Sequence, residues 1–141
     1  MTNAEDRLRN SISDYKNKIS DSYDKIAELE KQLCKYEEGL LEYRRVKKSF
    51  DVFMDEQKDS SEKLTLAASA FRFMKRYSSA MTGILTGTKR QRVENTFLSM
   101  ENKIKKAIEK TENDIEKEKR NINRHYDSID SLQRQLNRLI G

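Results

Sequence analysis

Apolar residues recur along the N-terminal half of the chain at alternating steps of four and three residues. Only Ser22 and Lys47 interrupt this stripe, and most of the positions between its members are charged or otherwise polar. Its members are Leu8, Ile12, Tyr15, Ile19, Ser22, Ile26, Leu29, Leu33, Tyr36, Leu40, Tyr43, Lys47, Phe50 and Met54. A repeat that averages 3.5 residues keeps facing a partner helix only when the two helices supercoil. The pattern therefore predicts a long helix that packs along its length against another helix.

Signals for a turn place the end of this helix near Gly87. We expect Gly87 to end the helix in the left-handed conformation, and Thr88 with Gln91 forms a capping box for a second helix. The predicted elements are a helix over about 3–85, a turn at 86–88 and a helix over about 89–139. Two helices joined by a short turn form an antiparallel hairpin. We therefore expect an all-α, elongated, coiled-coil-like antiparallel helical hairpin that forms a single domain over residues 1–141.

The two predicted helices differ in length. At the rise of an α-helix they would span roughly 125 Å and roughly 75 Å, so the second would reach back only to about residue 35. The stripe over 8–33 would then overhang, pair with another chain, or fold back through an additional break near residue 60. Asp59 and Glu62 have the spacing of a capping box at that point.

Composition argues against an enzyme. The chain contains no proline and four glycines, and 38% of its residues are charged, which is typical of long helices with charged exteriors. Cys34 and His125 are each the only residue of their type, which excludes an internal disulfide and a cysteine-rich zinc site. There is no nucleophile motif or phosphate-binding loop, so we expect no catalytic residues, no metal and no cofactor. We interpret His125 as a polar layer in the helix seam.

The net charge of +5 is unevenly distributed. Six basic residues cluster in the middle of the chain, namely Arg72, Lys75, Arg76, Lys89, Arg90 and Arg92. No nucleic-acid-binding fold accompanies them, so we interpret them as a solvated face and expect no nucleic-acid partner. No stretch approaches the ~20 apolar residues of a membrane span, and the N-terminus lacks the apolar core of a signal peptide. We expect a cytoplasmic protein without stable membrane insertion, and export without a cleavable signal peptide stays open.

Two short motifs resemble those of a known family. The turn Leu85-Thr86-Gly87 is followed ten residues after the glycine by Phe97. This arrangement resembles the WXG-type helical hairpins of the type VII secretion system, with leucine in place of tryptophan. It is most similar to the small helical accessory proteins encoded beside LXG toxins. The export motif of that family, Tyr-X-X-X-Asp or Glu, corresponds here to Tyr126 and Asp130, which lie one helical turn apart.

The resemblance implies a non-enzymatic adaptor, or targeting chaperone, that promotes toxin export. It would bind the N-terminal helical domain of an LXG toxin, together with a second small helical accessory protein, and present the complex to the secretion ATPase. The expected partner interface comprises Ile12, Tyr15, Ile19, Ile26, Leu29, Leu33, Tyr36 and Phe97. Two alternatives stay open. One is a structural coiled coil that self-associates through the stripe over 8–54, and the other is a basic helical module that binds nucleic acid or an anionic surface through residues 72–92.

Overall fold

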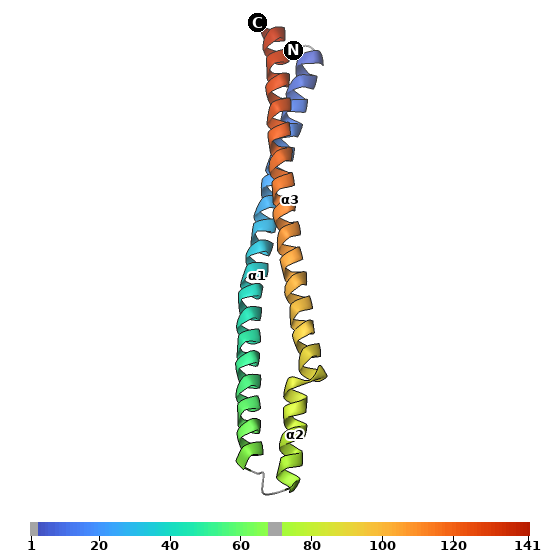
Figure 1. Cartoon of the computed structure of the whole chain (residues 1–141). Coiled ribbons are helices and arrows are strands. Elements are labelled where there is room, and N and C mark those ends of the chain that lie inside the picture. Colours follow the sequence, from blue (N-terminus) through green and yellow to red (C-terminus); the bar gives the residue numbers. More distant parts are fainter. Residues whose placement is uncertain (1–2, 68–71) are drawn as a thin grey trace. The chain divides into compact units, whose positions relative to one another are not determined.

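Helices account for almost the entire chain. In the computed structural model, which describes residues 3–67 and 72–141, helix α1 covers Asn3–Ala67, α2 covers Arg72–Thr86 and α3 covers Thr88–Ile140 (Figure 1). The described residues contain no strand. The all-α helical hairpin expected from the sequence is thereby confirmed.

The chain reverses direction between Ala67 and Arg72, not at Gly87. The side-chain oxygens of Ser61 in α1 and Thr82 in α2 lie 2.9 Å apart. In one continuous helix, 21 residues would separate these side chains by roughly 30 Å. The prediction of an uninterrupted helix over 3–85 is therefore wrong. Neither glycine nor proline occurs at 68–71, so local turn signals could not have located the reversal.

The position of the reversal removes the predicted mismatch in length. After the reversal, the 15 residues of α2 and the 53 residues of α3 run back along the 65 residues of α1. α1 also continues as a helix through residue 60, so the additional break that the sequence left open there is absent. The stripe over 8–33 does not overhang, because α3 of the same chain covers it. Burying that stripe removes apolar surface from water, which favours this reversal over one at Gly87.

Gly87 separates α2 from α3, but its conformation differs from the one we predicted. No glycine in the described part of the chain has a positive φ. The absence of a side chain matters here for another reason, because a Cβ on Gly87 would overlap the backbone carbonyl oxygen of Gly83. The backbone N–H of Gln91 donates a hydrogen bond of 3.2 Å to the carbonyl oxygen of Gly87, so α3 begins directly at this glycine.

The hairpin contains two compact units. The terminal unit combines Met1–Tyr36 with Ala107–Gly141, and the central unit is Glu37–Lys106. In the terminal unit, Ile19 and Ile26 of α1 form a buried core with Ile115 and Ile122 of α3. In the central unit, the ring of Phe97 in α3 lies between Tyr43 and Phe50 of α1, with ring centroids 5.6 and 5.3 Å apart.

Candidate interaction surfaces

The predicted partner interface lies inside the hairpin. Every member of the stripe over 8–54 is buried or half-buried, including the polar Ser22 and Lys47. Ile12, Ile19 and Ile26 are at most 8% exposed. Among the other predicted interface residues, Tyr15, Leu29, Leu33, Tyr36 and Phe97 are half-buried. The structure therefore gives these residues an intrachain role, and a second protein could reach them only if the two arms separated.

The facing stripe on α3 contains several polar side chains. Thr111 is buried, and its hydroxyl donates a hydrogen bond of 2.8 Å to the carbonyl oxygen of Ala107. Glu118 and His125 are half-buried at the next equivalent positions, and the ring of His125 packs against Tyr15 with centroids 5.6 Å apart. The interpretation of His125 as a packed polar layer agrees with this contact. Because polar groups alternate with isoleucines, this seam buries less apolar surface than a fully apolar coiled coil would.

Each residue of the Leu85-Thr86-Gly87 motif has a structural role in the central unit. Leu85 is 6% exposed, and the hydroxyl of Thr86 donates a hydrogen bond of 2.6 Å to the carbonyl oxygen of Thr82. Arg90 lies close to this boundary, within 2.8 Å of Asp55 in α1 and 3.2 Å of Glu94. The motif therefore marks a boundary between two consecutive helices and not the reversal of the hairpin.

The candidate export residues are both on the surface. Tyr126 is 47% exposed and Asp130 is exposed one turn later in α3. A hydrogen bond with Tyr23 of α1, followed by the charge interaction with it, raises the pKa of Tyr126 above its usual value. Tyr126 and Asp130 are accessible to another protein without any change in the hairpin, and Tyr23 belongs to the same surface.

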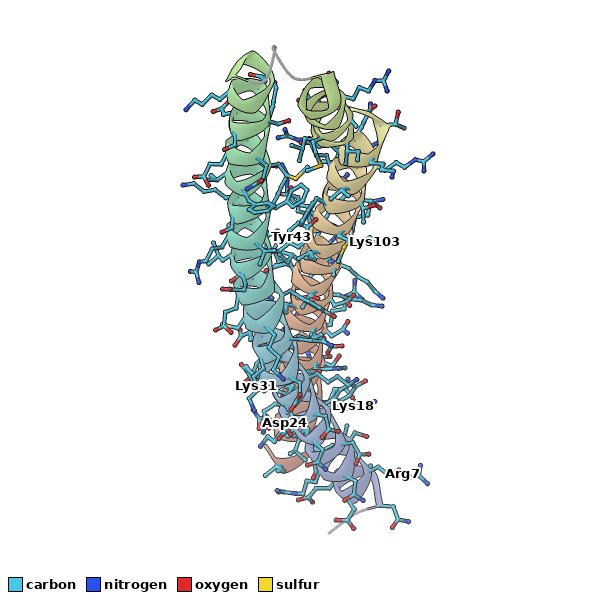
Figure 2. The ribbon with its side chains drawn as sticks, turned by 90° about the horizontal axis from the view of Figure 1, so that it is seen from below. Arg7, Lys18, Asp24, Lys31, Tyr43 and Lys103 are labelled. Carbon is cyan, nitrogen blue, oxygen red and sulfur yellow. The ribbon has the colours of Figure 1, made fainter. Side chains whose placement is uncertain are left out.

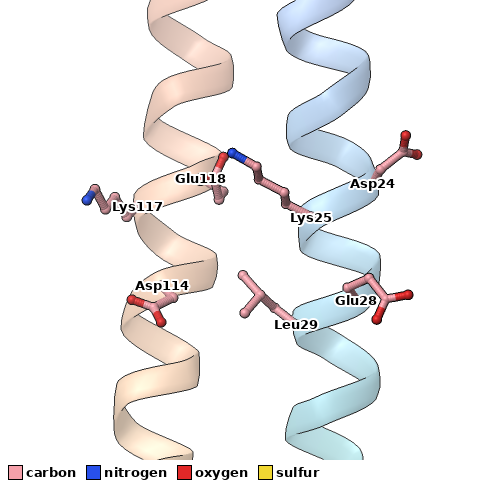
Figure 3. Close-up of a pocket in the computed structure, with 7 residues that line it drawn as sticks. All are labelled: Asp24, Lys25, Glu28, Leu29, Asp114, Lys117 and Glu118. Atoms are coloured by element: carbon pink, nitrogen blue, oxygen red, sulfur yellow. The ribbon is translucent and has the colours of Figure 1, made fainter.

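Shallow grooves follow the two sides of the seam in the terminal unit. One groove, shown in Figure 3, is lined by Asp24, Lys25, Glu28, Leu29, Asp114, Lys117 and Glu118. Lys25 and Leu29 of α1 extend toward α3, and Glu118 extends toward α1, whereas Glu28 points away from α3 (Figure 3). Most of the lining residues are charged, yet most of the exposed lining surface is apolar. The groove is open and offers no enclosed space for a small molecule.

The two sides of the seam differ in the central unit. On one side, ion pairs connect Arg44 with Glu101 at 3.0 Å and Arg90 with Asp55 at 2.8 Å. The Arg44 hydrogen bond is the main cause that lowers the pKa of Glu101 below the usual carboxyl value, and Lys105 adds to it. The Tyr43 hydroxyl donates a hydrogen bond to the carbonyl oxygen of Phe97 in the seam itself. Burial, followed by the charge of Glu101, raises the pKa of Tyr43.

The opposite side of the same seam is apolar and exposed. We call it the apolar flank, and it consists of Val46, Phe53, Val93 and Met100, which are between 39% and 55% exposed. Val46 and Phe53 were not predicted as surface residues of interest, because they lie to one side of the stripe. A signal for them was present, since Val46 and Phe53 are separated by seven residues, as are Val93 and Met100.

Among the residues that the structure describes, no group of three or more His, Cys, Asp or Glu side chains is placed to hold a metal ion. None of the described helices has an apolar stretch long enough to cross a membrane. Cys34 is exposed and forms no disulfide.

Comparisons with known proteins find no matching family model, no matching curated protein and no matching solved structure. The resemblance to the type VII accessory proteins consequently rests on the residues of this chain alone, namely the Leu85–Gly87 motif with Phe97 and the pair Tyr126 and Asp130.

Proposed function

We propose that this chain is a non-enzymatic adaptor that binds a helical segment of another protein. The observation that carries the proposal is the concentration of exposed apolar side chains in the central unit. They are Leu41, Val46, Val52, Phe53, Ile84, Val93, Leu98 and Met100. Four of them, Val46, Phe53, Val93 and Met100, form the apolar flank, and an exposed apolar patch commonly marks a site where another protein docks. A helix is the natural occupant of a groove between two helices, because apolar stripes with the same period interdigitate.

On the resemblance described above, the cargo is the N-terminal helical domain of an LXG toxin, bound together with a second small helical accessory protein. Tyr126 and Asp130 would be the residues that the secretion ATPase reads. Their exposure supports this role, because a receptor must reach both while the cargo is bound. The adaptor would accompany the cargo from the cytoplasm to the secretion machinery.

Of the two alternatives, self-association through the stripe over 8–54 has less support, because α3 of the same chain already covers that stripe. Binding of an anionic ligand through residues 72–92 is weakened at Arg90, which is paired with Asp55 and Glu94. The side chains of Arg72 and Lys75 lie outside those that the structure describes.

The first experiment mixes the full chain with the N-terminal helical domain of the protein encoded beside it, which the proposal expects to be an LXG toxin. Size-exclusion chromatography with light scattering should show a complex of defined stoichiometry. The chain should also melt at a higher temperature in the mixture, since a ligand that binds only the folded state stabilises it. Two proteins that elute separately at concentrations of tens of micromolar, with unchanged melting, would refute the proposed cargo.

The role of Tyr126 is tested separately from cargo binding. Tyr126→Ala should abolish secretion of the toxin from intact cells while the purified variant still forms the complex. Tyr23→Ala is the matched control, because it removes the neighbouring tyrosine of α1 and leaves the motif intact. Equal loss of secretion in both variants, or loss of the complex in Tyr126→Ala, would assign Tyr126 to packing and not to export.

A further inference from the structure

The four residues of the apolar flank lie on the same side of the seam of the central unit. In α1, Val46 lies three residues after the seam residue Tyr43, and Phe53 lies three residues after Phe50. In α3, Met100 likewise lies three residues after Phe97. In two antiparallel helices, residues with this same offset from the seam share one side. The terminal unit confirms the geometry, because Lys25 and Asp114 have the same heptad positions as Val46 and Met100 and line one groove (Figure 3).

This comparison shows that the apolar flank is a local feature. Lys25 precedes Val46 by three heptads, and Asp114 follows Met100 by two. At these equivalent positions the terminal unit therefore has charged side chains where the central unit has exposed apolar ones. A coiled coil whose only requirement is to hold its own two arms together gains nothing from apolar residues at solvated flanking positions. Their presence in one unit indicates a surface that is covered by something else.

Basic residues border the flank along α3. Lys89 lies four residues before Val93, and Lys103 lies three residues after Met100, so each is next to the flank on the surface of α3. Arg92 and Lys106 lie next to these two lysines, further from the flank. All four are exposed, and Figure 2 shows Lys103 extending from α3. Among the described residues, neither Lys89 nor Lys103 has an ion-pair partner.

The acidic residues of this part of α3 are engaged elsewhere. Glu94 pairs with Arg90, and Glu101 pairs with Arg44 and Lys105. As a result, every charged residue along the α3 edge of the flank is basic. The whole central unit contains 15 Lys and Arg against 10 Asp and Glu, whereas the terminal unit contains 14 of each. The entire net charge of the chain therefore resides in the unit that carries the apolar flank.

From these observations we infer that the apolar flank binds an acidic amphipathic helix of another protein. This inference rests on the proposed adaptor function and specifies its partner. The helix contributes an apolar stripe that packs on Val46, Phe53, Val93 and Met100 and carboxylates that face Lys89 and Lys103. It forms a third helix beside α1 and α3 in the central unit.

Charge distinguishes this occupant from two others. A second copy of the chain would add another central unit with the same excess of basic residues, and the two would repel each other. An anionic membrane would meet Lys89 and Lys103 but also Glu42 and Glu56, which border the flank along α1. A helix avoids this conflict because it can present carboxylates along one edge only. Coulombic attraction to the α3 edge also fixes the rotational orientation of the bound helix, with its carboxylates facing α3.

The test uses the full chain and a synthetic four-heptad peptide that has leucine at two positions of each heptad and glutamate along one edge. Fluorescence anisotropy should detect binding of this peptide, and binding should weaken as salt increases. A peptide of identical pattern with lysine in place of glutamate should bind at least tenfold more weakly, equivalent to about 1.4 kcal/mol. Equal binding of both peptides, or binding of neither, would overturn the inference.

Matched variants locate the site. Phe53→Ser should weaken binding of the acidic peptide about tenfold, as loss of a central aromatic contact commonly does. Val52→Ser should leave binding unchanged, because Val52 is similarly exposed but lies outside the flank. Lys103→Glu should also weaken binding, whereas Lys117→Glu, two heptads later at the same position of α3, should not. Equal effects within either pair would place the peptide elsewhere.

Four further outcomes separate this inference from the proposed function. A concentration-dependent homodimer that Phe53→Ser dissociates would show that a second copy covers the flank. Binding to phosphatidylglycerol vesicles without binding to the acidic peptide would assign the flank to a membrane. An LXG domain that binds Phe53→Ser as tightly as the unchanged chain would refute the inference but leave the adaptor function intact. An acidic peptide that binds while the LXG domain does not would refute the proposed cargo alone.

Discussion

Ser61 and Thr82 are 21 residues apart in the chain, yet their hydroxyl oxygens lie 2.9 Å apart. This hydrogen bond joins α1 to α2 within the central unit and shows that the polypeptide has already reversed before Gly87. Asp55 and Arg90 continue the same antiparallel pairing, at 2.8 Å. Both pairs are consistent with a reversal of the chain between Ala67 and Arg72. Cross-linking can test this arrangement.

Ser61→Cys combined with Thr82→Cys, in a chain that also carries Cys34→Ser, should form an intramolecular disulfide. The contact between the two side chains places them within the separation that a disulfide spans. Oxidised protein should migrate faster than reduced protein on a denaturing gel. The control pair Ser60→Cys with Thr82→Cys should form far less of this product, because Ser60 is exposed beside the contact. Exclusively intermolecular cross-links would contradict the reversal between residues 67 and 72.

Ile122→Ala should destabilise the terminal unit by about 2–4 kcal/mol, because it leaves a cavity in the core. Ile122 is 5% exposed and belongs to the cluster formed with Ile19, Ile26 and Ile115. Urea unfolding followed by circular dichroism measures the change. Leu41→Ala is the control, since Leu41 is 64% exposed and its truncation should change stability by less than about 0.5 kcal/mol. Similar losses in the two variants would mean that the observed core does not exist in solution.

Glu118→Leu should raise the free energy of unfolding by about 1–2 kcal/mol. Glu118 is half-buried at a seam position of α3, and leucine there would bury apolar surface in place of a carboxylate. Thermal unfolding provides the measurement. Glu112→Leu serves for comparison, because Glu112 is exposed six residues earlier and gains little by the same substitution. A lower melting temperature for Glu118→Leu would indicate that the carboxylate stabilises the seam.

The ion pair between Arg44 and Glu101 should make stability depend on pH. The pKa of Glu101 in the folded protein is lowered, mainly by the hydrogen bond from Arg44. This pair therefore contributes stability above the unfolded-state pKa, roughly 4.3, and that contribution is lost as pH falls through the lower folded value. In Glu101→Gln, the difference in unfolding free energy between pH 7 and pH 3 should be smaller.

The control for this experiment is Glu112→Gln. Glu112 is exposed and, among the described residues, has no ion-pair partner, so its neutralisation should preserve the pH dependence of the unchanged chain. If Glu101→Gln and Glu112→Gln behave alike, the Arg44 contact does not persist in solution.

Several features of the fold were predictable because they depend on local pattern. Every position of α1 that the 3.5-residue repeat identified from Leu8 to Met54 is buried or half-buried, even where Ser22 and Lys47 replace an apolar residue. Gly87 was also recognised as a helix boundary. The conformation of Gly87 was not, because its requirement for glycine comes from the nearby carbonyl oxygen of Gly83 and not from a positive φ.

The candidate surfaces also differ in whether the sequence alone could predict them. Tyr126 and Asp130 were singled out by the resemblance, and their common face was predictable because two residues four apart on a helix share a face in any fold. The apolar flank could not be found like this, because Val46 and Phe53 of α1 join Val93 and Met100 of α3 only through antiparallel pairing. Their residue types were visible, but their common side of the seam was not.

The sequence by itself determined that this protein is helical and which face of α1 is buried, because helical period and apolar spacing are properties of a single segment. Only the tertiary structure decided where the chain reverses, since 68–71 contains neither glycine nor proline and the reversal follows from matching the lengths of the two arms. The same pairing placed the stripe over 8–33 against its own α3. It also left the apolar flank exposed, because two helices can cover only the sides that face each other.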